Sequence, residues 1–173
     1  MIDLRSHIRD IPDFPKKGIV FKDITPLLAN AAAFRASVDA LAERYRGRVD
    51  MILGIESRGF IVGAALAHAL ATGLAVARKP GKLPHETYAA SYELEYGTDT
   101  LEIHRDALGP HHRVLLIDDL LATGGTASAA LQLVRHCGGT VVGCAFVVEL
   151  AFLRGRERLG GHETFSLVRY DAE

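Results

Sequence analysis

Two adjacent carboxylates and a loop of small residues form the part of the sequence best suited to chemistry. Asp118 and Asp119 follow an apolar run and precede a loop that contains Gly124 and Gly125. Glycine lets the backbone approach a ligand closely, and the amides that open the next helix favour a phosphate. Carboxylates instead suit hydroxyl donors, a metal ion or developing positive charge. The segment therefore predicts a site for a ligand such as ribose 5-phosphate.

The hydroxyls beside the two glycines strengthen this interpretation. Thr123 and Thr126 are expected to donate further hydrogen bonds to phosphate oxygens. An ordinary strand-to-helix turn with Thr126 as the N-cap explains the glycines and this threonine. It does not explain two charges at the end of a buried strand, where unpartnered charge is costly. The GxxxxGK[ST] and GxGxxG patterns do not occur, which disfavours a nucleoside triphosphatase or a dinucleotide enzyme.

The elements that must position these residues read as a single α/β domain over residues 1–173. Apolar runs typical of strands buried on both faces alternate with helical patterns, which predicts a mainly parallel sheet. Strands are predicted at 49–55, 74–77, 113–117, 140–148 and, more weakly, 165–168. Helices are predicted at 1–10, from Pro26 with Thr25 as its cap, and at 31–46, 59–71 and 126–136, with a β-ribbon or mobile loop over 83–105.

Polar residues follow four of the predicted strands. Because ligands bind beyond the carboxyl ends of parallel strands, we expect these residues to share one site. They are Glu56-Ser57-Arg58, Arg78-Lys79, Asp118-Asp119 and Glu149.

The run from Asp118 to Thr126 resembles the phosphoribosyl diphosphate (PRPP) signature of type I phosphoribosyltransferases. Four further blocks, in the right order, resemble the adenine-specific branch of that family: Asp13 to Pro26, Gly54 to Phe60, Arg78 to Pro84 and Leu94 to Gly97. The resemblance covers nearly the whole chain. It implies the type I fold, in which helices flank a central, mainly parallel sheet that carries a flexible β-ribbon hood, here about residues 83–105.

The resemblance also assigns expected roles to residues. The 5-phosphate loop is Ala122, Thr123, Gly124, Gly125 and Thr126, and the candidate catalytic residues are Arg58, Glu95, Asp118 and Asp119. Pyrophosphate is expected at Glu56, Ser57, Arg58, Arg78, Lys79 and Lys82, the last three partly across a dimer interface. Adenine is expected at Val20, Phe21, Lys22 and Leu150, and the hood residues are Glu95 and Tyr96.

Several of these residues have simpler interpretations. Arg58 suits diphosphate oxygens but also a surface salt bridge, and the cations near Lys79 also suit a solvated surface. Val20 and Phe21 also suit a hydrophobic core. Lys22 stands where the family often has Arg, which matters for the base only if the side chain, rather than the backbone, contacts it.

The implied reaction is purine salvage, in which adenine and PRPP give AMP and pyrophosphate. Mg²⁺ is expected on substrate oxygens with waters rather than on a dedicated protein site, and the histidines show no metal-ligand spacing such as HExxH. Two alternatives remain: a related enzyme for xanthine or guanine, and a regulator that binds PRPP without catalysis. The resemblance also implies a homodimer.

Composition limits the remaining classes. The formal net charge is −1, from 20 Lys+Arg against 21 Asp+Glu, without a basic stripe, so nucleic-acid binding is not expected. Residues 60–77 lack charge but are rich in Ala and Gly, which favours a buried helix and strand over a membrane span. The two cysteines do not form a CxxC pair, and no signal peptide is visible, so we expect a cytoplasmic protein.

Overall fold

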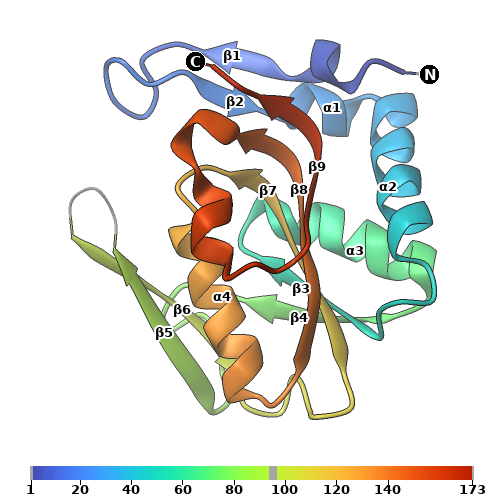
Figure 1. Cartoon of the computed structure of the whole chain (residues 1–173), viewed down its shortest axis with the longest axis vertical. Coiled ribbons are helices and arrows are strands. Elements are labelled where there is room, and N and C mark those ends of the chain that lie inside the picture. The colour runs from blue at the N-terminus through green and yellow to red at the C-terminus, as the bar shows by residue number, and fades with distance from the viewer. Residues whose placement is uncertain (1, 94–96, 173) are drawn as a thin grey trace.

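A five-stranded parallel sheet forms the centre of the protein in the computed structural model, which describes residues 2–93 and 97–172. The strand order is β4-β3-β7-β8-β9, and each neighbouring pair is parallel (Figure 1). The strands are β3 (Met51–Ile55), β4 (Gly73–Ala77), β7 (Arg113–Leu121), β8 (Thr140–Leu150) and β9 (Thr164–Tyr170). This arrangement confirms the predicted α/β class.

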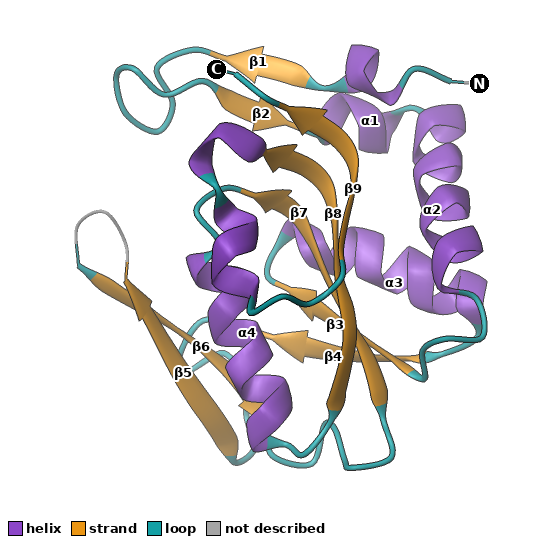
Figure 2. Ribbon diagram, in the orientation of Figure 1, coloured by secondary structure: helices purple, strands orange, loops and turns teal. Residues whose placement is uncertain are grey.

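Different layers cover the two faces of the sheet, as Figure 2 shows. On one face, α2 (Ala31–Tyr45) and α3 (Arg58–Leu70) pack Leu41 and Leu66 into a core that includes Leu115. On the other face, α4 (Gly125–His136) packs Leu131 into a core that includes Leu116. Consecutive strand residues point to opposite faces, so β7 is buried on both sides. This double burial explains its continuous apolar sequence.

The predicted ribbon is an antiparallel hairpin of β5 (Thr87–Glu93) and β6 (Thr98–His104). Its inner side buries Leu101 and Ile103 in the same core as α4. Tyr92 on β5 lies directly opposite Asp99 on β6. The hairpin therefore extends from the α4 side of the sheet as a small second sheet, as Figure 1 shows.

The N-terminal segment differs from the predicted helix over residues 1–10. A short 3₁₀ helix, η1 (Leu4–His7), is followed by β1 (Arg9–Ile11), which pairs antiparallel with β2 (Phe21–Asp23). Pairing with β2 gives the backbone of Arg9 to Ile11 stable hydrogen-bond partners. A short helix in isolation is only marginally stable, because its first turn is costly to form. The prediction of a ten-residue helix was therefore wrong.

The small helix α1 (Thr25–Ala29) begins differently from the prediction. Thr25 is its first residue, not its cap, and Pro26 lies in its first turn. The carboxylate of Asp23 accepts hydrogen bonds from the Thr25 amide at 2.9 Å and from its hydroxyl at 2.7 Å. Ile24 is the N-cap and no side chain caps the helix, so Asp23 fixes only its first residue.

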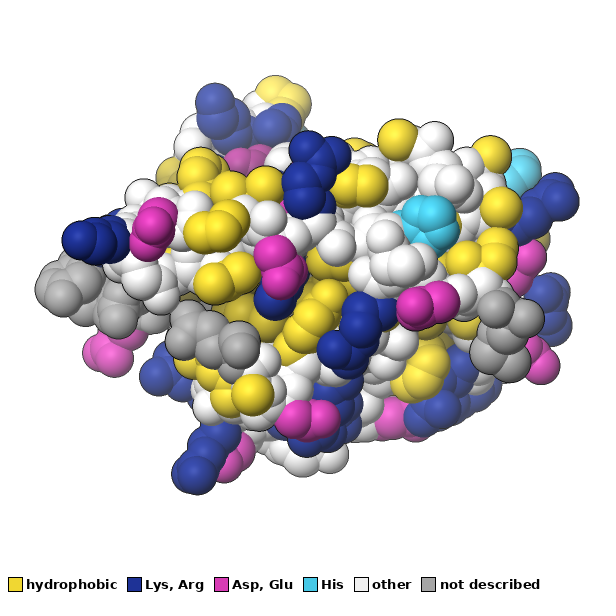
Figure 3. All heavy atoms as spheres, turned by 90° about the horizontal axis from the view of Figure 1, so that it is seen from above, with side chains coloured by type: hydrophobic (Ala, Val, Ile, Leu, Met, Phe, Trp, Pro, Cys, Tyr) yellow, Lys and Arg dark blue, Asp and Glu magenta, His cyan; other side chains and the backbone are white. Residues whose placement is uncertain are grey.

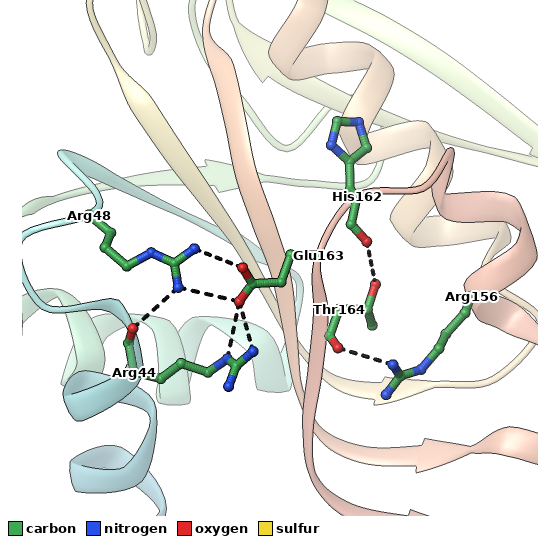
Figure 4. A network of polar contacts seen from close by, with 6 residues as sticks. All are labelled: Arg44, Arg48, Arg156, His162, Glu163 and Thr164. Carbon is green, nitrogen blue, oxygen red and sulfur yellow. Dashed lines mark hydrogen bonds and ion pairs between the residues drawn. The ribbon is translucent and has the colours of Figure 1, made fainter.

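A polar cluster ties α2 to the entry of β9, as Figure 4 shows. Arg44, near the end of α2, and Arg48, just after that helix, both pair with the carboxylate of Glu163, at 3.0 and 2.7 Å. On the other side of the same segment, Arg156 Nη1 donates to the carbonyl of Thr164 at 3.1 Å. These contacts attach the last strand of the sheet to elements on both sides of it.

Residues 60–77 divide into the end of α3 and β4, as expected. Of the helices described, none has both the length and the apolar character needed to cross a bilayer.

Candidate active site

A cavity of about 350 Å³ lies where the carboxyl ends of β3 and β7 meet the start of α4. Three of the four predicted polar clusters contribute to it. Its lining consists of Glu56, Ser57, Arg58, Lys79, Tyr92, Leu101, and every residue from Asp118 to Ala127. The structure thus brings together the turn after β3, the segment after β4, the two carboxylates and the glycine loop.

The two carboxylates lie within β7 rather than after it. The strand continues to Leu121 because it keeps its pairing with β8 beyond the carboxylates, where Leu120 lies opposite Val148. Asp118 and Asp119 are 8% and 6% exposed. The Asp119 amide donates to Asp118 Oδ1 at 2.9 Å, which fixes one carboxylate beside the other.

Burial raises the pKa of Asp118 well above its usual range, and the neighbouring carboxylate of Asp119 raises it further. The start of α3 lies directly against this group. A Cβ added to Gly59 would lie 2.9 Å from Asp118 Oδ1, so only glycine allows the helix to approach so closely. The site therefore holds one strongly desolvated carboxyl beside a second carboxylate that faces Arg58.

The glycine loop presents backbone amides at the start of α4. Gly124 is the N-cap, with φ +82°, and no side chain caps the helix there. Thr126, considered as a cap above, lies inside the helix. Among the residues described, none accepts a hydrogen bond from the amides of Gly124, Gly125 or Thr126. Together with the helix dipole, these amides form a site for an anion.

A later segment holds the loop in shape. Gly155, at the start of the 3₁₀ helix η3 (Gly155–Leu159), lies against the loop backbone. A Cβ on Gly155 would collide with the carbonyl oxygen of Ala122, and one on Gly124 would collide with the carbonyl oxygen of Gly155. The absence of side chains on both residues therefore allows two backbone segments to pack together.

Three of the four cations expected to bind pyrophosphate donate to a carboxylate. Arg58 Nε donates to Asp119 Oδ2, and Arg78 Nε donates to Glu56 Oε2 at 2.8 Å. Lys79 donates to Asp99. Arg58 and Lys79 line the cavity, whereas Arg78 and Lys82 are not among the lining residues. Arg78 Nη1 donates to the carbonyl of Lys82 at 3.4 Å, which links these two residues to each other.

A second cavity, of about 470 Å³, adjoins the first. It contains all four residues expected to bind adenine: Val20, Phe21, Lys22 and Leu150. The two cavities share Leu120, Ala122 and Thr123. A mostly apolar cavity thus opens beside one lined by carboxylates, cations and amides.

Lys22 belongs to this second cavity but its side chain is engaged elsewhere. The residue is 5% exposed, and its ammonium group pairs with Asp10 at 2.8 Å and lies 4.4 Å from the centre of the Tyr170 ring. Its contribution to the cavity is therefore mainly its backbone.

The structure adds lining residues that the sequence analysis missed. Tyr92 and Leu101 line the first cavity, and Glu93, Phe152, Leu153 and Arg158 line the second. Tyr92 and Leu101 are placed there by the pairing of β5 with β6. Of the three arginines at 154, 156 and 158, Arg158 lines the second cavity. Their spacing in the sequence does not distinguish it from the other two.

Glu149 does not join the shared site, contrary to the sequence prediction. Its carboxylate is 2% exposed and accepts hydrogen bonds from Arg156 Nε at 2.5 Å and from Ser166 Oγ at 2.8 Å. Burial by itself raises the pKa of this carboxyl, but the hydrogen bonds from Arg156 and Ser166 outweigh burial and lower it. Glu149 is therefore a structural ion-pair partner.

The predicted hood lies partly outside the described residues. Glu95 and Tyr96, predicted as hood residues, belong to the segment 94–96 that the structure does not describe. The strand that leads to them reaches the glycine loop: a Cβ on Gly125 would lie 3.2 Å from the Tyr92 ring and 3.3 Å from the Glu93 carbonyl oxygen. The hairpin therefore borders the anion site.

Comparison with known proteins identifies the family. The model of the phosphoribosyl transferase domain matches residues 23–164. An adenine phosphoribosyltransferase of Syntrophotalea carbinolica is 61% identical over 171 residues, which cover 98% of this chain and all of the relative. The chain belongs to the phosphoribosyltransferase family, in its adenine branch.

Solved adenine phosphoribosyltransferases share the fold as well as the sequence. The enzyme of Thermoanaerobacter pseudethanolicus superposes with a TM-score of 0.94 at 52% identity, covering 96% of this chain and 98% of the other. An adenine phosphoribosyltransferase of Trypanosoma brucei, in complex with AMP, pyrophosphate and ribose-5-phosphate, has a TM-score of 0.89 at 27% identity, with 96% and 78% covered. The family's type I fold is thus present along almost the whole chain.

Proposed function

We propose that the protein transfers the 5-phosphoribosyl group of PRPP to adenine, giving AMP and pyrophosphate in purine salvage. The observation that carries the proposal is the pair of adjoining cavities that share Leu120, Ala122 and Thr123. One cavity has amides, carboxylates and cations for a phosphorylated sugar, and the other has an apolar wall for a flat base. The reaction joins these two ligands at the boundary between the cavities.

The phosphoribosyl part of the substrate fits the first cavity. The amides of Gly124 and Gly125 would bind the 5-phosphate, with the hydroxyls of Thr123 and Thr126 as further donors. Asp118 and Asp119 would accept hydrogen bonds from the ribose hydroxyls. They also lie where positive charge develops on the sugar as the bond between C1 and the diphosphate oxygen breaks.

The leaving group and the base complete the reaction. Arg58 and Lys79, which line the first cavity, would stabilise the negative charge on pyrophosphate, with Glu56 and Ser57 forming the wall beside them. Purine N9 would attack C1 from the opposite face and lose its proton. Glu95 is the candidate for managing that proton, and with Tyr96 it would help to exclude water that otherwise hydrolyses the activated sugar.

Mg²⁺ is the cation that we propose for this site. Within the described parts of the chain, no group of three or more His, Cys, Asp or Glu side chains could hold a metal ion. The oxygen-rich lining at Glu56, Asp118 and Asp119 nevertheless suits a hard cation that keeps its waters and binds mainly to diphosphate and ribose oxygens. When bound, Mg²⁺ would neutralise charge on the leaving diphosphate.

A homodimer and a cytoplasmic location complete the proposal. Ile61 on α3 and Leu74 on β4 are 46% and 39% exposed, and α3 packs against β4, the strand that leads to Arg78 and Lys79. Covering these apolar side chains in a dimer would bring a second subunit close to the first cavity. The free cysteines, Cys137 and Cys144, suit a reducing compartment.

Pyrophosphate release tests the function. The purified protein is given Mg²⁺, PRPP and, separately, adenine, hypoxanthine, guanine or xanthine. Turnover with adenine alone supports the proposal, and turnover with another base would retain the chemistry but reassign the apolar cavity. Saturable PRPP binding without turnover on any base would favour a PRPP-binding regulator instead.

A further inference from the structure

The ammonium group of Lys79 is held by two residues of the hairpin. Lys79 Nζ donates to Asp99 Oδ2 on β6 and lies 3.2 Å from the hydroxyl of Tyr92 on β5. The Tyr92 hydroxyl also donates to Asp99 Oδ2, at 3.1 Å. The other carboxylate oxygen of Asp99 accepts a hydrogen bond from the Thr100 amide at 2.8 Å. Asp99 is therefore fixed in position as the counter-ion of Lys79.

Asp99 differs from the other carboxylates that pair with cations of this region. Glu56 and Asp119, the partners of Arg78 and Arg58, both line the 350 Å³ cavity. Asp99 is not among the lining residues, although Lys79 and Tyr92 are. The reaction proposed above assigns this carboxylate no role, so its contact with Lys79 needs a separate explanation.

Pyrophosphate and Asp99 require the same cation. A lysine ammonium group has three donors, and the hairpin engages it through Asp99 and Tyr92. A diphosphate that binds Lys79 must displace a carboxylate already paired with it, and the displaced carboxylate then lies near an anion of several charges. Both effects oppose diphosphate binding. Solvent screening weakens both effects, because the side chains of Lys79 and Asp99 are 40% and 28% exposed.

We propose that Asp99 is an internal competitor of pyrophosphate for Lys79. It weakens diphosphate binding and, by recovering the lysine, speeds the departure of pyrophosphate after transfer. The backbone hydrogen bonds between Glu102 and Arg78 keep the hairpin joined to the segment after β4, so the competition concerns only the side chain of Lys79. The inference rests on the proposed function, since it requires pyrophosphate to bind at Lys79.

Direct binding of pyrophosphate in the presence of Mg²⁺ tests the inference, with calorimetry for the Kd and stopped-flow mixing for the dissociation rate. Asp99→Asn keeps the shape of the side chain and removes the charge. We expect pyrophosphate to bind this variant about threefold to tenfold more tightly and to leave more slowly. The melting temperature of Asp99→Asn should change little, which separates competition from a structural effect. Asp99→Ser should show the same tighter binding and slower dissociation of pyrophosphate.

Two further variants separate competition from general repulsion. Asp106→Asn removes one charge from the segment just after the hairpin and should leave the Kd unchanged, because Asp106 does not line either cavity. In a Lys79→Met background, Asp99→Asn should change the Kd by less than about twofold, because the shared cation is gone.

Distinct results would overturn the inference and the function. If Asp99→Asn leaves pyrophosphate binding unchanged or weakens it, Asp99 is not a competitor. If the tighter binding persists in the Lys79→Met background, it arises from repulsion alone and competition is excluded. If the unmodified protein binds neither pyrophosphate nor PRPP, the proposed function fails as well.

Discussion

Arg58 and Asp119 form an ion pair across the wall of the 350 Å³ cavity, through Arg58 Nε and Asp119 Oδ2. Arg58 is the first residue of α3, and Asp119 lies in β7. The cation proposed for the leaving group and a carboxylate proposed for the ribose thus neutralise each other before substrate binds. In the proposed reaction, PRPP separates Arg58 from Asp119 and takes up both side chains. Until then the two charges compensate each other, so neither is buried without a partner.

Asp119→Asn should lower kcat/KM by about a hundredfold or more while the fold stays intact. The variant loses the negative charge next to the sugar and also the counter-ion of Arg58. Steady-state kinetics with adenine and PRPP measure the loss, circular dichroism checks the fold, and Asp106→Asn is the control. Activity close to that of the unmodified protein would remove Asp119 from the catalytic residues.

Gly155→Ala should raise the KM for PRPP and destabilise the protein by about 1–3 kcal/mol. The added methyl group collides with the carbonyl oxygen of Ala122 and distorts the glycine loop. Gly47→Ala is the matched control: Gly47 has φ +71°, and a Cβ there meets nothing within 4 Å. This control should lose about 1 kcal/mol from backbone strain with an unchanged KM. An equal KM for both variants contradicts the prediction.

Asp118 should make stability depend on pH. Burial and the adjacent Asp119 raise the pKa of Asp118 well above its ordinary value of 3.8. The folded protein then keeps a proton that the unfolded chain has lost, so this group lowers stability as the pH rises from about 4 towards the raised pKa. Asp118→Asn should remove that decline. Urea unfolding across this pH range measures it, and parallel pH profiles for the two proteins would contradict it.

Arg156→Ala should destabilise the protein by about 2–4 kcal/mol, because it leaves the buried carboxylate of Glu149 without its cation. Chemical unfolding measures the loss. Arg35→Ala, at an exposed position of α2, should stay within about 0.5 kcal/mol of the unmodified protein. Adding Glu149→Gln to Arg156→Ala should recover part of the stability; no recovery would show that the ion pair is not the cause.

The two cysteines should react with thiol reagents at very different rates. Cys144 is fully buried, and burial raises its pKa to about 12, so little thiolate forms and no reagent reaches it. Cys137 is only partly buried, although burial raises its pKa as well. A disulfide reagent should label Cys137 first and Cys144 only at the rate of unfolding. Rapid labelling of native Cys137→Ser protein would disprove this.

The sequence allowed prediction of the features that depend on local pattern. The strands at β3, β7 and β8 follow from apolar runs long enough to be buried on both faces, and the loop at Gly124 follows from glycine beside threonine at a helix start. The expected adenine residues also meet in one cavity, although Val20 and Leu150 are far apart in the chain. That grouping came from family resemblance rather than from periodicity.

Long-range partners could not be predicted in the same way. Glu149 had the same apparent context as the other polar residues after strands, but its partners are Arg156 and Ser166, which come from later elements. The N-terminal segment has a short amphipathic pattern, yet pairing with β2 decides its conformation. In each case a contact between distant segments outweighs the local preference.

The packing of Gly155 on the glycine loop has a consequence for protein engineering. The loop keeps its shape because the backbone of a later segment, at the start of η3, packs directly against it. Transplanting the loop alone into another α/β scaffold would therefore leave out the segment that holds its shape. The grafted residues would be the same, but their backbone conformation would be lost. A functional graft would need both segments, and a shuffled library of this family should preserve them as a pair.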